Sequence, residues 1–412
     1  MCYIWWMEMK NTFKDDGMVI FFIIVPLVYP LLYSWIYTNE VVREVPVAVV
    51  DMSHSRSSRS FIQMLDATPD VHVAYHCNNL TEVRNLVGKG VIYGAIHIPA
   101  DYERRLGRGE QTHVSVYCDM ALMLTYKAIY QSATAVSMTL GSRMQAARSG
   151  SITQRDAEIA TAPLRVEAIP MFNATGGYGN ALLPSVLLLI LQQTLLLGIG
   201  LSAGTARESN RYSDLVPIGK HYNGIFRIVL GKSLCYFMLY AVMGAYVTLC
   251  VPRFFGYTSL ISSPTYILGL MVPFLLSCIF FGMFLSCLVR YRENIMLLVV
   301  FTSVPMLFLV GVSWPEPVVP GYLKGIAWLL PSTFGVRGYL TISSMGGTLQ
   351  DIRPEYQSLW LQTAFYFFLT CIVYRHQILR ARRHTTDQMK SIQEKVRQPV
   401  AKKSPQSDDL SI

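Results

Sequence analysis

The sequence predicts an α-helical polytopic membrane protein with six transmembrane helices and an extracytoplasmic α/β domain inserted between helices 1 and 2. Of the 412 residues, 52% are hydrophobic and only 15% are charged, whereas soluble proteins carry about 25% charged residues. The apolar residues also gather in runs of roughly 20, the length at which a helix crosses the hydrocarbon core of a bilayer. These two observations exclude an ordinary soluble protein and a disordered one.

Residues 1–17 predict a cytoplasmic helix that lies in the membrane interface. The apolar Ile4, Trp5 and Phe13 are interspersed with the charged Glu8 and Lys10, a pattern typical of an amphipathic helix at the level of the lipid headgroups. An unstructured leader is the alternative.

Six runs meet the length requirement for a transmembrane helix. The first is not a cleaved signal peptide on this interpretation, because Asp15 and Asp16 precede it and the aromatic Tyr33, Trp35 and Tyr37 stand where a small-residue cleavage site would lie. The predicted spans are residues 18–37, 182–204, 225–250, 264–289, 294–312 and 358–374.

Residues 38–179 carry no membrane signal and are numerous enough for one folded domain. Short β-branched or alternating stretches predict strands, and helical stretches fall between them, a pattern that favours a small α/β domain with a partly parallel sheet. Ser53 and Ser55 are candidate N-caps of the first helix. A longer helix over residues 121–148 has the length of a stalk. The predicted strands are 45–51, 71–76, 93–99 and 113–117, and the short helices are 53–66 and 81–87.

Cys77 and Cys118 of this domain follow predicted strands and would face an oxidising compartment. A disulfide between them and a pair of free thiols are both left open. His72 and His76 are four residues apart, which would suit a metal ion on a helix, but on a strand they lie about 13 Å apart. We therefore predict no metal site, and no serine, histidine and aspartate grouping predicts a catalytic residue.

The distribution of basic residues predicts the orientation. Lys and Arg number 35 against 26 for Asp and Glu, which gives a net charge of +9. Most basic residues near the spans lie in residues 1–17, 205–224 and 375–412, which the positive-inside rule places in the cytoplasm together with both termini. The tail 375–412 is predicted to be disordered. Its arginines directly follow a span, so we expect it near anionic lipid and predict no nucleic-acid partner.

The last predicted outside loop covers residues 313–357. Its apolar stretch 322–330 is too short to cross a bilayer, so we expect an interfacial or re-entrant helix there.

Residues 230–233 superficially end like a phosphate-binding loop. Such a loop needs glycine where Phe226 stands and a strand before it, so the chain is predicted to hold no ATP-binding loop and to bind no cofactor. Lys232 is interpreted as a snorkelling or helix-packing cation.

Neutral polar residues are sparse within the predicted spans. They are candidates for a translocation path, with hydrogen bonds between helices as the alternative interpretation. No Asp, Glu or Arg is predicted at mid-span, which argues against an ion-coupled transporter and places the energy source outside this chain. The candidates are Gln192, Gln193, Thr194 and Gln362.

Four places together resemble one family, the permease subunits of type-2 ATP-binding-cassette (ABC) exporters, in their bacterial multidrug-efflux-like branch. One span, a large outside domain and five further spans follow in the same order. The matching places are residues 8–14 with Pro26, residues 45–51 with Ser58, Phe172 and Asn173 with Pro184, and residues 311–331 with their prolines.

The resemblance implies that the cytoplasmic loop 205–224 couples to a separate ABC ATPase subunit, which would bind ATP and Mg. The sequence departs from the family at residues 210–213, where Asn-Arg-Tyr-Ser replaces a frequent Gly-Thr. The candidate contact residues are Arg207, Glu208, Arg211 and Lys220.

The resemblance further implies a second permease, identical or related, a bacterial inner-membrane location, and a docking place for a periplasmic adaptor and outer-membrane channel. The expected cargo is an amphipathic or lipid-like compound moved outward. The alternative is a membrane-anchored protein that binds a ligand or acts as a scaffold through its periplasmic domain.

Overall fold

A computed structural model of the chain forms two compact units, residues 1–38 with 178–412, and residues 39–177. The structure describes residues 1–38, 42–120, 122–149, 172–173, 177–208, 224–257, 259–261, 263–288, 291–311 and 319–397. Each unit is described by itself.

The second unit contains a four-stranded sheet of order β2-β1-β3-β4. β1, β2 and β3 are parallel and β4 is antiparallel to β3, as expected for the partly parallel sheet. Alternate residues of β1 pack on opposite faces, Val47 and Val49 on one and Ala48 and Val50 on the other, because side chains alternate along a strand. The strands are β1 (Val45–Asp51), β2 (Val71–His76), β3 (Gly94–Ile98) and β4 (Ser115–Cys118).

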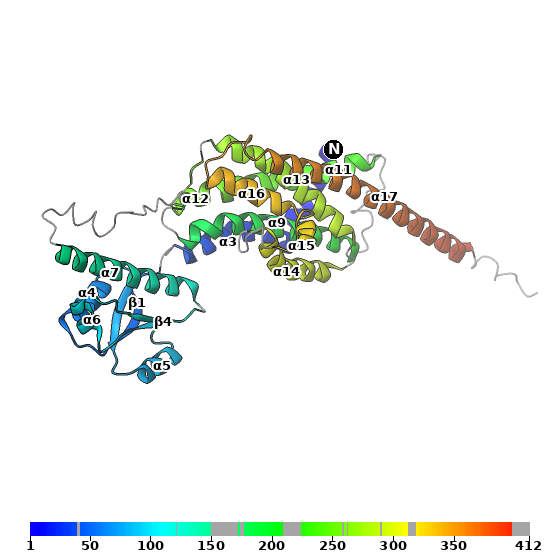
Figure 1. Ribbon diagram of the computed structural model, residues 1–412. Helices are drawn as coiled ribbons and strands as arrows, with labels where there is room; N and C mark the ends of the chain where they lie inside the picture. Colours follow the sequence, from blue (N-terminus) through cyan, green and yellow to red (C-terminus); the bar gives the residue numbers. More distant parts are fainter. Residues whose placement is uncertain are drawn as a thin grey trace, which may run out of the picture. The chain divides into compact units, whose positions relative to one another are not determined.

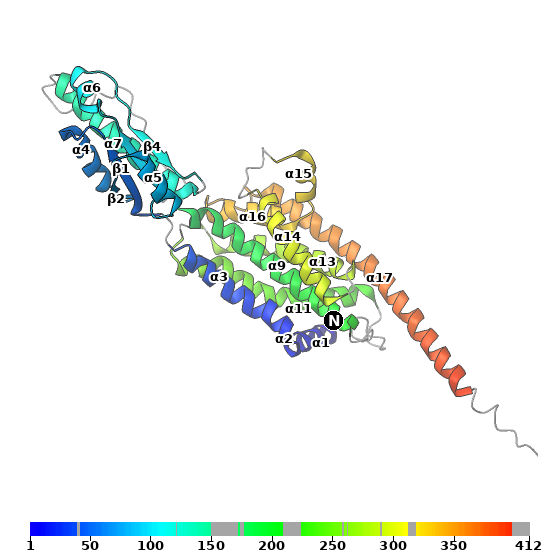
Figure 2. The same cartoon turned by 90° about the horizontal axis from the view of Figure 1, so that it is seen from below.

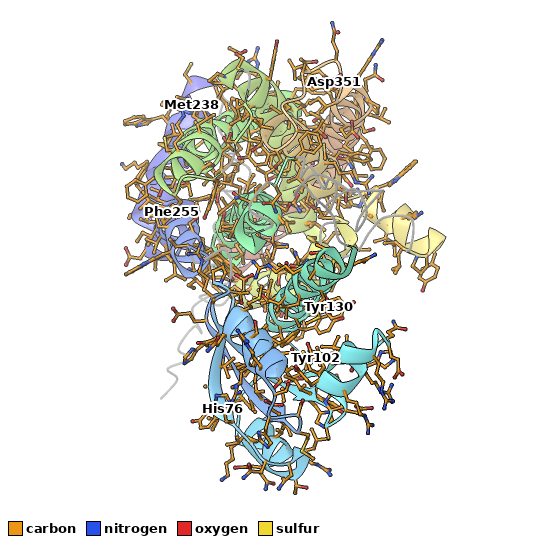
Figure 3. All side chains as sticks on the ribbon, turned by 60° about the vertical axis from the view of Figure 1, so that its left-hand side comes forward. His76, Tyr102, Tyr130, Met238, Phe255 and Asp351 are labelled. Atoms are coloured by element: carbon orange, nitrogen blue, oxygen red, sulfur yellow. The ribbon has the colours of Figure 1, made fainter. Side chains whose placement is uncertain are left out.

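Helices cover both faces of this sheet (Figure 1). α4 (Arg56–Asp66), α6 (Tyr102–Arg108) and α7 (Met123–Ser149) pack on one face, and α5 (Leu80–Gly88) packs on the other. α7 matches the predicted long helix but is no free stalk, because residues such as Ile129 and Val136 are buried in the domain core. Figure 3 shows Tyr102 of α6 and Tyr130 of α7 in this unit.

The turn after β1 explains the residue pattern at the start of this domain. Asp51 Oδ1 accepts hydrogen bonds from the backbone N–H groups of Ser53 and His54, at 3.0 and 3.1 Å, and Oδ2 accepts one from the Ser58 hydroxyl at 2.7 Å. Ser55 is the N-cap of α4 and forms a reciprocal capping box with Ser58, which satisfies backbone donors that a helix start leaves free. The aspartate and serines therefore fix the strand-to-helix connection.

The described part of the first unit is a helical bundle in which five helices are long and apolar enough to cross a membrane, and they coincide with five of the predicted spans. They are Asp16–Ile36, Gly179–Thr205, Ile225–Phe254, Pro264–Leu288 and Arg292–Leu309. The sixth predicted span, residues 358–374, lies in a longer helix that is not among the five, and it stays a prediction.

The bundle is built from α1 to α3, α9 and α11 to α17 (Figure 2). α9 and α13 are mostly buried, whereas few residues of α3 and α14 are buried. Two short π-helical segments, η1 (Ile20–Ile24) and η2 (Tyr246–Cys250), interrupt the first and third spans. The helices are α1 (Cys2–Lys14), α2 (Asp16–Val19), α3 (Val25–Ile36), α9 (Tyr178–Glu208), α11 (Ile225–Ala245), α12 (Val251–Phe254), α13 (Pro264–Leu288), α14 (Arg292–Leu309), α15 (Gly321–Ala327), α16 (Pro331–Ser343) and α17 (Arg353–Arg397).

α17 is attached to α13 by side-chain hydrogen bonds at a seven-residue interval. Thr363 donates to the carbonyl of Pro273 at 3.2 Å, Thr370 to that of Phe280 at 3.0 Å, and Gln377 to that of Cys287 at 3.2 Å. A seven-residue repeat keeps the same helix face against its partner over several turns, and polar side chains can join helices in a membrane in this way.

α17 corrects one prediction. The tail was expected to be disordered from residue 375, but the helix continues to Arg397. The reason is local propensity, because residues 375–397 contain no glycine or proline and many good helix formers.

The loop 313–357 also differs from expectation. The short helix predicted at 322–330 corresponds to α15, but α16 is the helix buried in the bundle. A Cβ on Gly335 of α16 would lie 2.3 Å from the ring of Phe274 of α13. The small residues of α16 therefore allow the two helices to approach closely. The burial of residues 331–343 could not be predicted from their modest hydrophobicity, because small residues pack closely without being strongly apolar.

Candidate functional site

One face of α1 is buried against the bundle, and whether this helix also lies in the membrane interface stays a prediction. Ile4, Glu8 and Thr12 are the buried residues of this helix, and a spacing of four places them on one face. Glu8 is only 5% exposed. An acidic residue buried to this degree requires partners, because an unpaired buried charge is strongly unfavourable.

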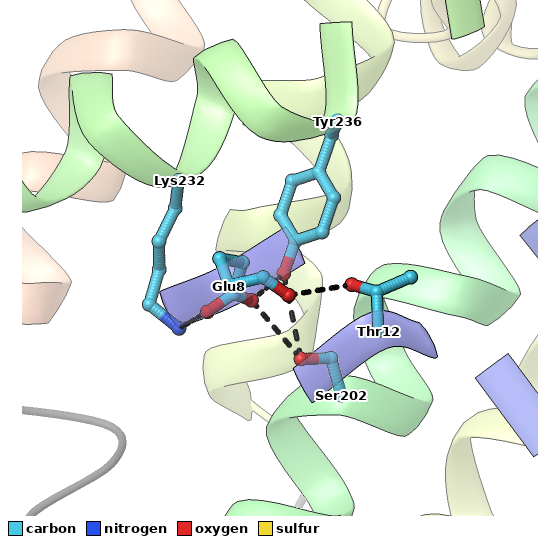
Figure 4. Close-up of polar contacts among 5 residues, drawn as sticks. All are labelled: Glu8, Thr12, Ser202, Lys232 and Tyr236. Carbon is cyan, nitrogen blue, oxygen red and sulfur yellow. Dashed lines mark hydrogen bonds and ion pairs between the residues drawn. The ribbon is translucent and has the colours of Figure 1, made fainter. Parts of the chain in front are cut away.

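Glu8 has partners from two membrane helices (Figure 4). Its Oε2 forms an ion pair of 2.8 Å with Lys232 Nζ of α11. Its Oε1 accepts hydrogen bonds from the Tyr236 hydroxyl of α11 and, at 3.2 Å, from the Ser202 hydroxyl of α9. Lys232 and Tyr236 are four residues apart and so share one face of α11. We call these four residues the Glu8 network.

The Glu8 network holds its carboxylate in the ionised form. Burial by itself would raise the pKa of Glu8, but the charge of Lys232 and the hydrogen bonds from Lys232, Tyr236 and Ser202 outweigh it and hold the pKa below its usual value. The carboxylate therefore stays negative at neutral pH and binds Lys232 as an ion pair.

The Glu8 network lies near the end of α9 and the start of α11. Ser202 precedes the last residue of α9, Glu208, by under two turns, and Lys232 lies about two turns after the start of α11 at Ile225. Residues 209–223 connect these two helices. Glu8 therefore binds both helices that flank the segment, and a displacement of either helix acts on α1.

A second polar cluster lies at the same end of the bundle, where α9 ends and α11 and α14 begin. We call this the junction end. Asp15 caps α2 by accepting from the backbone N–H of Gly17 at 2.9 Å. It also binds Arg292 of α14 at 3.4 Å and accepts from the Thr205 hydroxyl of α9 at 3.2 Å.

Two glycines bring Arg292 close to its neighbours. A Cβ on Gly17 would lie 2.1 Å from Arg292 Nη2, and one on Gly204 would lie 2.9 Å from Arg292 Cα. The start of α14 is therefore packed tightly against both α2 and α9. Together the two clusters join α1, α2, α9, α11 and α14 at the junction end.

The structure does not describe the side chains of the four predicted ATPase contact residues. Arg207 and Glu208 are the last residues of α9, but their side chains are not described, and Arg211 and Lys220 lie outside the described residues. Their role stays a prediction.

The predicted path residues are engaged in contacts between helices. Gln192 is fully buried, and its Nε2 donates to the Ser332 hydroxyl of α16 at 3.3 Å. Gln362 Nε2 donates to the carbonyl of Trp328 at 2.6 Å, and Thr194 donates to carbonyls of its own helix. The contacts of Gln192 and Gln362 fit the alternative interpretation, in which the polar side chains hold helices together, whereas the hydrogen bonds of Thr194 stay within α9.

Gln193 differs from the other path residues. Its Nε2 lies 3.0 Å from the Met306 sulfur of α14, while its buried Oε1 has no hydrogen-bond partner within the described part of the chain. A role of these four residues in translocation remains a prediction.

Cys77 and Cys118 are free thiols in the structure. Cys77 follows β2 and Cys118 ends β4, and these strands form the opposite edges of the sheet, about 14 Å apart at 4.8 Å per strand. Their side chains also pack in cores on opposite faces. A disulfide requires Cα atoms within about 7 Å. Cys77 and Cys118 of the same chain are therefore too far apart to pair, and both are free thiols.

His72 contacts Asp66 at 3.3 Å on the exposed surface, and Figure 3 shows His76 in the same unit. Among the described residues, no three His, Cys, Asp or Glu side chains lie close enough to hold a metal ion.

Sequence reasoning missed both ion pairs. Lys232 was interpreted as a snorkelling or packing cation and Glu8 as part of a polar helix face, whereas each neutralises the other inside the bundle. One signal was present. Glu8 is four residues from Ile4, so it shares a helix face with an apolar side chain.

Comparison with known families gives one match. A family model described as ABC-2 family transporter protein matches residues 17–372, which is most of the chain. No curated protein matches the sequence significantly.

Proposed function

Because the chain belongs to the ABC-2 transporter family and is a permease subunit of that type, we propose that it exports amphipathic or lipid-like compounds, such as drugs or lipids, with ATP hydrolysed by a separate subunit. The proposed location is the bacterial inner membrane with both termini in the cytoplasm. The multi-pass bundle with its apolar spans supports a membrane location.

The Glu8 network is the observation that supports ATP-driven coupling most directly. It binds α1 to the helices on both sides of residues 209–223 through one buried carboxylate. A force applied to this segment by an ATPase would reach α9, α11 and α1 together. Transmission of this kind needs packed elements that move as units.

Lys232 also supports a separate ATPase. The residues that superficially resemble the end of a phosphate-binding loop lie inside α11, and the Lys232 ammonium binds Glu8. Lys232 is therefore occupied by a protein carboxylate and is not presented to a nucleotide.

We propose that two permeases, identical or related, assemble with two ATPases and form the path between them. The exposed apolar side chains of α14, among them Phe301 at 75% and Val304 at 60% exposed, suit either lipid or a second permease. The α/β domain would provide the docking surface for a periplasmic adaptor that leads to an outer-membrane channel.

The test is purification of the tagged full-length chain in mild detergent, identification of bound proteins by mass spectrometry, and reconstitution in vesicles. We expect a stoichiometric ATPase and ATP-dependent transport of a fluorescent amphiphile. Glu208→Ala should reduce transport, while Glu110→Ala, an exposed acid of the α/β domain, should not. Absence of an ATPase in several detergents, with partner binding by the α/β domain, would favour the ligand-binding or scaffold alternative.

A further inference from the structure

A groove of about 350 Å³ lies between α11, α13 and α17. Its walls are aliphatic and aromatic side chains. Phe280 and Phe367 form one wall through an edge-to-face ring contact with centroids 5.1 Å apart. The apolar lining is completed by Leu230, Leu276, Trp360, Ala364 and Phe368.

The two hydroxyl groups that line the groove are engaged by the protein. Ser233 donates to the carbonyl of Leu230 at 3.1 Å, and Thr363 donates to the carbonyls of Leu359 and Pro273 at 2.8 and 3.2 Å. The groove therefore presents no free hydrogen-bond donor from these residues. A hydrocarbon chain matches such walls, whereas a polar ligand would lose its own hydrogen bonds.

The groove opens on a face of α11 that suits contact with lipid. Every fourth residue along this helix is exposed and apolar, a stripe that includes Leu234, Met238 and Val242 at 47%, 48% and 67% exposed. Figure 3 marks Met238 on this helix. An apolar stripe on a candidate membrane span faces acyl chains, so lipid chains have direct access to the groove.

Two exposed arginines lie at one end of this groove. Arg227 precedes Leu230 by three residues on α11, and Arg375 follows Phe368 by seven on α17, so each lies on the same helix face as a lining residue. α11 begins at the junction end. The Gln377 contact with Cys287, near the end of α13, places Arg375 at the junction end as well.

We infer that this groove binds one anionic phospholipid of the surrounding bilayer, with an acyl chain along the aromatic wall and the phosphate between Arg227 and Arg375. Arginine is well suited to phosphate because its planar guanidinium can donate two parallel hydrogen bonds. The site goes beyond the proposed function, because it does not depend on which compound is exported.

The site is adjacent to the Glu8 network. Ser233, which lines the groove, follows Lys232 directly in α11. A bound acyl chain therefore packs against the same turn of α11 that Glu8 holds from the other side.

Trp360 provides a reporter inside the groove. The full-length chain is placed in phosphatidylcholine nanodiscs, and phosphatidylglycerol or phosphatidylcholine with brominated acyl chains is titrated in. Bromine quenches tryptophan fluorescence on contact, and the difference between the wild type and Trp360→Phe isolates the signal of Trp360. We expect saturable quenching at lower concentrations of the anionic lipid than of the zwitterionic one.

Variants then test the two parts of the site. Arg227→Gln and Arg375→Gln should each weaken the apparent affinity for brominated phosphatidylglycerol about fivefold, because a basic residue near anionic lipid contributes about that factor. Arg253→Gln removes the same charge from an exposed position on α12 and should leave the affinity unchanged. Ala364→Phe, which fills the groove, should abolish the quenching of Trp360.

Equal quenching by the two lipids, or affinities that the arginine variants leave unchanged, would overturn the inference. So would full quenching in Ala364→Phe. Thermal unfolding of each variant shows that loss of binding is not loss of folding. The assay contains no ATPase, so failure of lipid binding and failure of the proposed export function are measured separately.

Discussion

Substitution of Lys232 by methionine tests the buried ion pair of the Glu8 network. Methionine keeps an unbranched apolar side chain but removes the ammonium 2.8 Å from Glu8 Oε2. The Glu8 carboxylate then keeps Tyr236 and Ser202 as its partners among the described residues. Removing one member of a buried ion pair costs about 3–5 kcal/mol. Because two hydroxyl donors remain, we expect a loss of about 3 kcal/mol in the free energy of unfolding.

The double variant Glu8→Leu with Lys232→Met gives a contrasting expectation. It removes both charges together, and an apolar replacement of a buried ion pair is often neutral or stabilising. We therefore expect the double variant to recover most of the loss, with a coupling energy of about 2–3 kcal/mol between the two positions. Contacting residues commonly show coupling energies up to this size.

The measurement is a double-mutant cycle of unfolding in mild detergent, followed by tryptophan fluorescence. Additivity of the two single substitutions within about 0.5 kcal/mol would refute the ion pair, since independent sites add to that precision. Transport gives a second result. If the network couples α1 to the flanking helices, the double variant regains stability but not ATP-dependent transport. Recovery of both would show that the network only stabilises the fold.

The pH dependence of this pair follows from the lowered pKa of Glu8. A carboxyl whose pKa is lower in the folded than in the unfolded state contributes stability above the unfolded value and loses it as the pH falls through the folded value. With a reference value of 4.5, the contribution is constant at neutral pH and declines below about pH 4.5. Glu8→Gln should remove this acid-dependent part of the unfolding curve.

The remaining predictions concern the packing at the junction end and the cysteines of the α/β domain. Gly204→Ala should cost about 1–3 kcal/mol through overpacking, because the added Cβ meets the Arg292 backbone. Gly17→Ala should cost less, because its Cβ meets only the end of the flexible Arg292 side chain. Equal unfolding midpoints of the two variants would contradict this. Burial raises the pKa values of Cys77 and Cys118, and Glu82 raises that of Cys77 further, so alkylation at pH 7 should be slow and should accelerate above pH 9. Fast labelling at pH 7, measured by mass spectrometry, would contradict it.

The α/β domain could be predicted closely because its signals are local. β1 and β2 begin and end where the alternation predicted, and Ser55 is the N-cap as anticipated. Period-two patterns and capping residues act within a few positions along the chain. The alternation of strands and helices also predicted the partly parallel sheet, because parallel neighbours are joined by crossover connections.

The polar contacts of the bundle could not be predicted in the same way. Glu8 and Lys232 are 224 residues apart, and nothing local to either position indicates the other. The burial of α16 depends on how closely Gly335 approaches Phe274, which is a property of the packed helices. Pairing of distant residues depends on tertiary packing, which overrides local patterns.

Because two ion pairs join the helices at the junction end, we expect conformational change to occur further along the spans. Breaking the Glu8 network costs several kcal/mol, which keeps α1, α9 and the start of α11 together. Beyond it, η1 and η2 replace regular helix in the first and third spans with wider turns, closed by the N–H groups of Val25 and Val251. π-Helical turns are common places of kinks. We therefore expect backbone amides of η1 and η2 to exchange hydrogen faster during ATP turnover than those of α9 near Ser202, and equal protection of the three segments would refute bending at these turns.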